Sequence, residues 1–381
     1  MKKLFYIYFL FYYAFLFLYA HYLNIGDFEI KYLSQNYPMT LIENLFFSLF
    51  GKSNFILRLP EIILSIFSII LYYKISKKYL KKQKDVYLAT IIFSLIPGFI
   101  LATLLFNKSI YIIFLVLVFI YSFLYYRIYS YLFLLLFTII DKSFISLYLG
   151  LIFYSIYKRD TQFLIYSLFL LMVNANYFHY EIKGLPRGHF IDIFLIYSAI
   201  FSPFVFIYFL YSLIKIFKKP TLLWFISSWG LLFSFLLSFR QRIKIDDFAP
   251  FVVVSVVFMV SIFLSDYRIR LKIFRPTYRK LFSFLLFSLI VFDIFILSSP
   301  YFLDVKIVSQ FRYSKEIFDK LKQKNINYFE CNNRILCEKL YFYGLQKGDK
   351  YFIYFNKKDK KVSISHNNRA LYNFYVSKLN K

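Results

Sequence analysis

Glycine is scarce in this chain of 381 residues, and its nine copies are scattered. No Gly-x-Gly-x-x-Gly run and no Gly-x4-Gly-Lys-Ser/Thr run occurs, so the sequence offers no loop of the kind that holds a nucleotide phosphate. His-Glu-x-x-His, Cys-x-x-Cys and Gly-x-Ser-x-Gly patterns are missing as well. Their absence argues against the common zinc sites and against the nucleophile elbow of serine hydrolases.

Acidic residues are also few, with 20 Asp and Glu against 47 Lys and Arg and a net charge of +27. The composition does not favour nucleic acid as the partner, because 60% of the residues are hydrophobic, well above the share in soluble domains. Apolar runs of about 20 residues recur, which is the length that crosses a bilayer. A backbone in lipid must satisfy its own hydrogen bonds. We therefore predict an α-helical polytopic membrane protein.

We predict about eleven membrane spans. They lie near residues 4–23, 56–76, 86–106, 109–126, 128–140, 143–157, 161–176, 190–214, 221–239, 248–265 and 281–300. The fifth and sixth are short and pivot on Asp141-Lys142, so a re-entrant pair is an alternative for them. Lys and Arg concentrate in every second loop, starting with Lys2-Lys3, and such loops face the cytoplasm. This bias predicts a cell inner (plasma) membrane protein with a cytoplasmic N-terminus and an extracytoplasmic C-terminus.

Two parts outside the spans have patterns of their own. In the first outer loop (24–55), a capping box at Thr40 and Glu43 and a terminating Gly51 predict an interfacial helix over 40–50. The tail (301–381) turns polar, and we expect a small soluble α/β domain beside a transmembrane domain of residues 1–300. The tail pattern places a helix after Ser314 and strands at Tyr328-Phe329, Tyr351 to Phe355 and Val362 to Ser365, with a turn at 357–360. Its Cys331 and Cys337 form either a disulfide or two free thiols, and spacing alone leaves both open.

The acids that remain gather in the predicted outer loops. Asp27-Phe28-Glu29 directly follows the first span, where a membrane enzyme would keep its carboxylates. Asp27 is thus a candidate general base, although capping of the next helix is an alternative. His179, His189 and Glu181 lie on the same predicted side, and a divalent metal is a further possibility there.

Three stretches resemble the GT-C class of membrane glycosyltransferases, in particular the protein O-mannosyltransferases and the aminoarabinose transferases that modify lipid A. The first is the acidic pair Asp27-Phe28-Glu29, and the second is Pro38 followed by Phe50-Gly51-Lys52-Ser53 through Arg58-Leu59-Pro60. The third runs from Arg240-Gln241-Arg242-Ile243-Lys244 to Phe248-Ala249-Pro250. A tail with Tyr341-Phe342-Tyr343-Gly344 fits the same pattern.

The resemblance implies an enzyme that takes a sugar from a polyprenyl-phosphate carrier and passes it, with inversion, to an extracytoplasmic lipid, glycan or protein acceptor. Asp27 would be the base, and Glu29 would orient the acceptor or help to hold a metal. The anionic leaving group needs cations, and the candidates are Arg58, Arg240, Arg242, Lys244, Lys108 and Lys142. A helix-start or headgroup contact is the alternative for Arg58, and anchoring to anionic lipid is the alternative for Arg240 to Lys244.

The chain departs from the family pattern at four points. Phe28 separates the two acids, and only Lys31 corresponds to the basic residue that follows them in the family. Tyr37-Pro38 replaces a Pro-Pro pair, and Asn107-Lys108 stands where the family has an Asp. Two other functions therefore stay open at this point. One is a polymerase or ligase of lipid-linked glycans, and the other is a non-catalytic membrane scaffold of the same fold.

Overall fold

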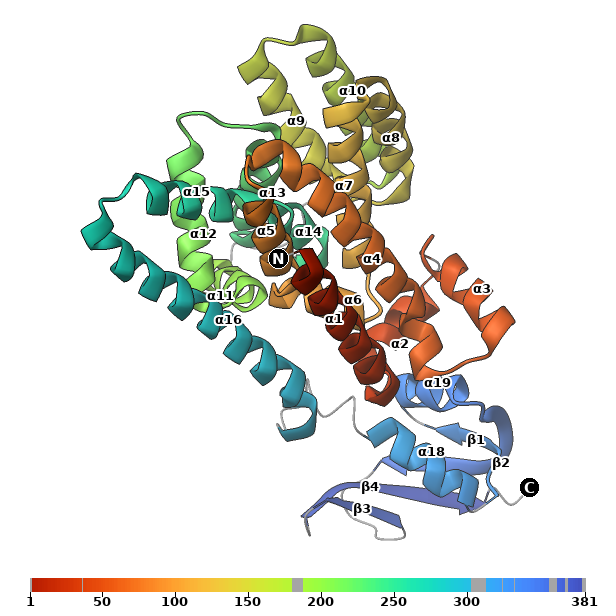
Figure 1. Ribbon diagram of the computed structural model, residues 1–381. Coiled ribbons are helices and arrows are strands. Elements are labelled where there is room, and N and C mark those ends of the chain that lie inside the picture. Colours follow the sequence, from red (N-terminus) through yellow and green to blue (C-terminus); the bar gives the residue numbers. More distant parts are fainter. Residues whose placement is uncertain are drawn as a thin grey trace. The chain divides into compact units, whose positions relative to one another are not determined.

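The computed structural model describes residues 2–35, 37–179, 188–302, 313–323, 325–331, 333–355, 362–366 and 369–378. Helices make up most of this part of the chain, and the strands belong to its C-terminal end, drawn in blue in Figure 1. Two compact units can be separated: Met1–Phe9 with Glu61–Ile296, and Leu10–Pro60 with Leu297–Lys381. The boundary predicted at residue 300 is close to one of these divisions, and the separate tail domain stays a prediction.

Three helices contribute residues to both units: α1 (Lys2–Tyr22), α4 (Asn54–Tyr79) and α16 (Arg275–Phe302). All other elements of the first unit within the described residues are helices. They are α5 (Gln83–Ser94), α6 (Pro97–Leu104), α7 (Ser109–Tyr125), α8 (Arg127–Ile140), α9 (Phe144–Lys158), α10 (Thr161–Tyr177), α11 (Phe190–Phe201), α12 (Pro203–Ile216), α13 (Leu222–Ser238), η1 (Ile245–Asp247), α14 (Ala249–Val253), α15 (Val256–Ile269) and η2 (Lys272–Phe274).

The expected multi-pass membrane protein is confirmed, but the count of eleven spans is not. Among the described residues, four helical segments are long and apolar enough to cross a bilayer, and two bent pairs bring the number to six. The four are Lys2–Tyr22, Asn54–Tyr79, Ala249–Ile269 and Lys272–Pro300. Both bends precede a proline at the first helical position: α5 and α6 meet at 58° before Pro97, and α11 and α12 at 102° before Pro203. Other predicted spans, such as α8 and α9, are apolar helices shorter than the usual span of about 20 residues.

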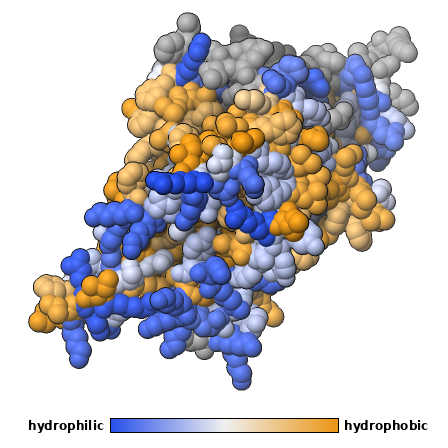
Figure 2. Space-filling model, turned by 90° about the horizontal axis from the view of Figure 1, so that it is seen from above, coloured by the Kyte–Doolittle hydropathy of each residue, from blue (hydrophilic) through white to orange (hydrophobic). Residues whose placement is uncertain are grey.

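The outer surface agrees with a lipid environment. Figure 2 shows broad hydrophobic areas on the face in view, beside hydrophilic ones. On α16, large apolar side chains such as Phe287 and Ile294 are more than half exposed. Exposed apolar side chains in such numbers are uncommon on soluble proteins, and a hydrocarbon solvent explains them.

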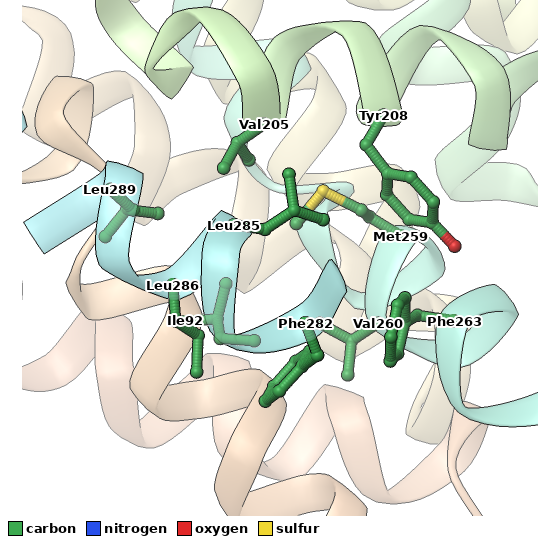
Figure 3. A pocket seen from close by; sticks show the side chains of 10 residues that line it. All are labelled: Ile92, Val205, Tyr208, Met259, Val260, Phe263, Phe282, Leu285, Leu286 and Leu289. Carbon is green, nitrogen blue, oxygen red and sulfur yellow. The ribbon is translucent and has the colours of Figure 1, made fainter. Parts of the chain in front are cut away.

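A small pocket in the first unit is lined by apolar side chains, apart from one tyrosine hydroxyl. It lies between α5, α12, α15 and α16 (Figure 3). Its lining residues are Ile92, Val205, Tyr208, Met259, Val260, Phe263, Phe282, Leu285, Leu286 and Leu289. None of the candidate acids or cations within the described residues lines it, so this pocket adds no support to the predicted site.

The second unit contains α2 (Asp27–Ser34) and α3 (Thr40–Phe50) from the first loop. The helix predicted over 40–50 is present, and Gly51 ends it with a φ of 80°, a conformation that suits glycine. The predicted capping box is wrong, because Met39 is the N-cap and the Thr40 hydroxyl donates to the Tyr37 carbonyl at 2.7 Å. Thr40 and Glu43 are buried. The apolar side chains of Leu41, Leu45 and Leu49 are exposed, as an interfacial helix requires.

The tail adds α18 (Tyr313–Gln323), β1 (Tyr328–Cys331), α19 (Arg334–Phe342), β2 (Gln346–Phe355), β3 (Val362–His366) and β4 (Arg369–Lys378). The sheet order is β1-β2-β4-β3; β1 and β2 are parallel, with α19 as their crossover, and the other two pairings are antiparallel. A small core joins the helices to β1: Ile317, Leu321, Ile326, Phe329, Leu340 and Leu345.

The predicted tail elements are largely present. The helix and the three strands occur, although Ser314 lies inside α18, and α19 and β4 were not predicted. The turn at 357–360 lies outside the described residues. Among the residues described there is no free cysteine, and Cys337 is disulfide-bonded, so of the two alternatives the disulfide is the one found.

Candidate active site

The acidic pair lies at the start of α2. Gly26 is the N-cap, and its backbone N–H donates to the Glu29 carboxylate at 2.7 Å. Asp27 is the first residue of the helix, so the alternative in which Asp27 serves as the N-cap is wrong. The carboxylate that satisfies the helix start is that of Glu29, three residues after the cap. The two acids therefore have different roles.

Glu29 and Arg58 form a buried ion pair. Their side chains are 2% and 0% exposed, and Nη2 of Arg58 lies 3.2 Å and 3.0 Å from the two Glu29 oxygens. The guanidinium also donates to the carbonyls of Leu23 (2.7 Å), Asn24 (3.0 Å) and Asn54 (3.0 Å). These bonds hold the turn between α1 and α2 against the start of α4. The guanidinium of Arg58 is therefore bound by groups of the protein itself, which agrees with the alternative of a helix-start contact.

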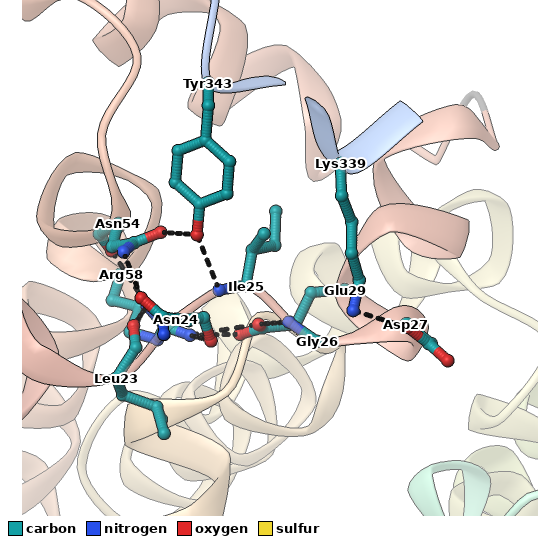
Figure 4. A network of polar contacts seen from close by, with 10 residues as sticks. All are labelled: Leu23, Asn24, Ile25, Gly26, Asp27, Glu29, Asn54, Arg58, Lys339 and Tyr343. Atoms are coloured by element: carbon teal, nitrogen blue, oxygen red, sulfur yellow. Dashed lines mark hydrogen bonds and ion pairs between the residues drawn. The ribbon is translucent and has the colours of Figure 1, made fainter. Parts of the chain in front are cut away.

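Asp27 lies at the edge of this network (Figure 4). Its side chain is 39% exposed, and its Oδ1 is 2.5 Å from Nζ of Lys339, which is 3% exposed and stands on α19. Burial lowers the pKa of Lys339, and the neighbouring carboxylates of Asp27 and Glu29 offset part of that effect. The accessible acid of the pair is therefore Asp27, and a lysine from the tail contacts it.

Tyr343 connects the tail to the same turn. Its hydroxyl donates to Asn54 Oδ1 at 3.0 Å and accepts from the backbone N–H of Ile25 at 3.4 Å. The Asn54 amide donates in turn to Asn24 Oδ1 at 3.2 Å. Figure 4 shows the two ends of this network, Tyr343 and Lys339, reaching the residues before and after Gly26. The turn that presents Asp27 is thus held on two sides.

A second polar cluster lies in the first unit. Lys108, just before α7, is 2% exposed and contacts Asp141 at 2.9 Å and also Asp247. Burial acts to lower the pKa of Lys108, but the two carboxylates together raise it above its usual value. Lys142 is 43% exposed and lies 3.5 Å from Asp247. Of these two predicted phosphate ligands, Lys108 is enclosed by acids and Lys142 is accessible.

This arrangement leads to a stability prediction. Lys108→Met should lower the free energy of unfolding by about 3 kcal/mol, because Asp141 and Asp247 would then lose their buried cation. Lys142 remains near Asp247 in this variant, so the loss of unfolding free energy should be at the lower end of the range for a broken buried ion pair. Reversible unfolding in detergent would measure the change. Lys142→Met is the matched control and should cost less than about 1 kcal/mol, since the pair is partly exposed. Equal losses of unfolding free energy in Lys108→Met and Lys142→Met would contradict the assignment of Lys108 as the buried partner of the two carboxylates.

The remaining predicted cations lie between α13 and η1. Arg240, Arg242 and Lys244 have exposed side chains, and the backbone N–H of Arg240 donates to the Leu237 carbonyl at 3.0 Å. Exposed cations before a helix are accessible to an anion, whether a lipid headgroup or a sugar phosphate. Their role in donor binding stays a prediction.

The metal hypothesis gains no support. His189 Nδ1 lies 3.3 Å from Asp192 Oδ2, and Glu181 falls outside the described residues. Among the residues described, no group of three or more His, Cys, Asp or Glu side chains is arranged to hold a metal ion, and His179 is part of none. We derive no step through a metal.

Sequence reasoning gave no site role to Lys339, Asn54 or Tyr343, although Tyr343 belongs to the tail motif that resembles the family. One local signal existed, because Lys339 stands between Cys337 and Leu340, which are both buried. Lysine is rarely buried unless it has a partner. A lysine at such a position therefore indicates a carboxylate nearby, although it does not say which one.

The comparison with known families adds to this geometry. The matched region begins at Pro38 and includes α3, Arg58 and the helices through α8. Residues 38–140 match the dolichyl-phosphate-mannose-protein mannosyltransferase family. The resemblance inferred from the motifs is confirmed for this part of the chain, and it supports a GT-C glycosyltransferase. The matched part of this chain includes Arg58 and Lys108, whereas Asp27, Glu29 and the tail lie outside it. No curated protein matches the chain.

Proposed function

We propose that this protein transfers a sugar from a polyprenyl-phosphate carrier to a hydroxyl of an extracytoplasmic acceptor, with Asp27 as the general base. The observation that carries the proposal is the accessible carboxylate of Asp27 at the first turn of α2, beside a buried Glu29–Arg58 pair that fixes the turn. The family match supports the class of reaction, because the family name describes transfer from dolichyl phosphate. The missing nucleotide loop agrees with a donor carried by a lipid.

The reaction is a single displacement. The acceptor oxygen forms a bond to the anomeric carbon while its proton passes to the Asp27 carboxylate. The bond from the anomeric carbon to the phosphate oxygen breaks, and its electron pair leaves with the polyprenyl phosphate. Attack from the opposite face inverts the anomeric carbon. Glu29, with its contacts to Gly26 and Arg58, positions the helix start and takes no proton.

Cations are needed where negative charge develops on the phosphate. We propose the exposed Arg240, Arg242 and Lys244 for this contact, with Lys142 as a further candidate. Arg58 and Lys108 are buried against carboxylates, which supports a positioning role for both. The alternating distribution of basic loops supports a cytoplasmic N-terminus and an extracytoplasmic acceptor.

The test uses the purified full chain in lipid nanodiscs with polyprenyl-phosphate mannose, the donor type that the family name suggests. Sugar should be transferred to an acceptor hydroxyl, and the product should have the opposite anomeric configuration to the donor by NMR. Nucleotide-linked mannose is the control and should not react. Turnover of the nucleotide donor, or a product that retains the donor configuration, would overturn the proposal.

A further inference from the structure

Lys339 brings a charge from the C-terminal segment to the first outer loop. It lies 312 positions after Asp27 in the chain, and its Nζ is 2.5 Å from Asp27 Oδ1. The two helices that carry them, α19 and α2, pack against each other. Next to this contact, the rings of Phe342 and Phe47 meet edge to face at 5.8 Å. The ion pair is therefore part of a packed interface within the second unit.

Burial makes this lysine unusual. Its side chain is 3% exposed, and an ammonium removed from water needs a compensating charge. The apolar core of the tail includes the neighbouring Leu340, which is 0% exposed, but not Lys339. Leu340 fixes α19, and with it the position of Lys339. A charged residue that is costly to bury and lies outside this core points to a role at its partner, Asp27.

We propose that Lys339 is a positioning residue for Asp27, so that the C-terminal segment completes the candidate active site; this rests on the proposed function. The ammonium holds Oδ1 at 2.5 Å and so fixes the orientation of the carboxylate that accepts the proton. Figure 4 shows the other carboxylate oxygen turned away from Lys339. Lys339 itself transfers no proton.

The carboxylates that act on the Lys339 ammonium include those of Asp27 and Glu29 on α2. Glu338, the neighbouring acid on α19, pairs with Arg334 at 2.9 Å. Because burial lowers the pKa of Lys339, the ammonium loses its proton at a lower pH than an exposed lysine would. Above that pH the hold on Asp27 is lost. The transfer rate should then fall on the alkaline side of its pH profile. Below that pH Lys339 is charged and its contribution is complete.

The first test is Lys339→Met in the full chain, assayed with polyprenyl-phosphate mannose. Methionine fills the same volume and is easier to bury, so the fold should be retained. We expect kcat to fall about 10- to 100-fold, the usual effect of a misplaced catalytic group, with little change in the donor KM. The matched control is Lys347→Met in β2, where the side chain is 73% exposed and 3.9 Å from Glu330. It should retain the normal rate.

The second test is Lys339→Arg. Arginine keeps its proton throughout the accessible pH range. This variant should recover part of the rate, and its alkaline fall should move to higher pH or disappear. A purely structural role for Lys339 would leave the alkaline limb unchanged.

The outcomes separate this inference from the function on which it rests. If Asp27→Asn abolishes transfer while Lys339→Met matches Lys347→Met in rate and pH profile, the positioning role is wrong and the enzyme assignment stands. If Asp27→Asn transfers sugar normally, the base assignment fails first. A Lys339→Met protein with a raised donor KM and an unchanged kcat would instead indicate a donor contact, which also overturns the proposal.

Discussion

Replacing Asp27 by Asn should lower the rate of sugar transfer about 10²- to 10⁴-fold, the usual contribution of a positioned acid–base group. Asparagine keeps the shape of the side chain but cannot accept the acceptor proton. A change in helix capping would not contribute to this effect, because Gly26 is the N-cap and the Glu29 carboxylate accepts the hydrogen bond from its N–H. Steady-state rates with a lipid-linked donor measure the effect. Donor KM should change little, since the phosphate is assigned to other residues.

The control for Asp27→Asn is Asp192→Asn, which makes the same change at a side chain that is 66% exposed and lies beside His189. It should transfer sugar at the normal rate. Asp192→Asn should unfold at the normal temperature, whereas Asp27→Asn should unfold at a lower one, because the buried Lys339 would lose its carboxylate. A normal rate in Asp27→Asn would leave the protein without a base and would favour the non-catalytic scaffold.

The two acids of the pair show how far local sequence reasoning reaches. Their position at the end of the first span was predictable, and so was a helix in the following loop. Their different exposure, 39% for Asp27 and 2% for Glu29, was not. Residues two apart on an α-helix point to nearly opposite sides, because each residue turns about 100°. Deciding which side is buried requires α4, which supplies Arg58.

Contacts between distant segments were beyond reach for a similar reason. Lys339 pairs with Asp27 across 312 positions, and Lys108 pairs with Asp247 across 139. Charge patterns predict such pairs only within one helix, where spacing fixes the neighbours. For the membrane spans, the sequence predicted the composition of the helices but not their shape. Their apolar character was evident, but the bends before Pro97 and Pro203 change two of them from straight helices into broken ones.

Replacing Arg58 by Met should lower the free energy of unfolding by about 3–5 kcal/mol, the range for removing one partner of a buried ion pair. Glu29, only 2% exposed, would keep a charge without its cation. The carbonyls of Leu23, Asn24 and Asn54 would lose a donor as well. Reversible unfolding in detergent, followed by circular dichroism, measures the loss. The motif resemblance alone suggests a different result, in which weaker donor binding is the main effect.

Two further variants separate these explanations for Arg58. Arg334→Met is the control in the same unit, where an 86% exposed arginine pairs with Glu338 four residues away, and it should cost less than about 0.5 kcal/mol. Adding Glu29→Gln to Arg58→Met should restore part of the stability. The glutamine is neutral and its carbonyl oxygen can still accept from Gly26, so the uncompensated charge is removed while the helix start is kept. If Arg58→Met were as stable as Arg334→Met but required more donor for half-maximal rate, Arg58 would contact the donor phosphate. The buried ion pair between Arg58 and Glu29 would then have to break during the reaction. The turn that presents Asp27 would have to move at the same time.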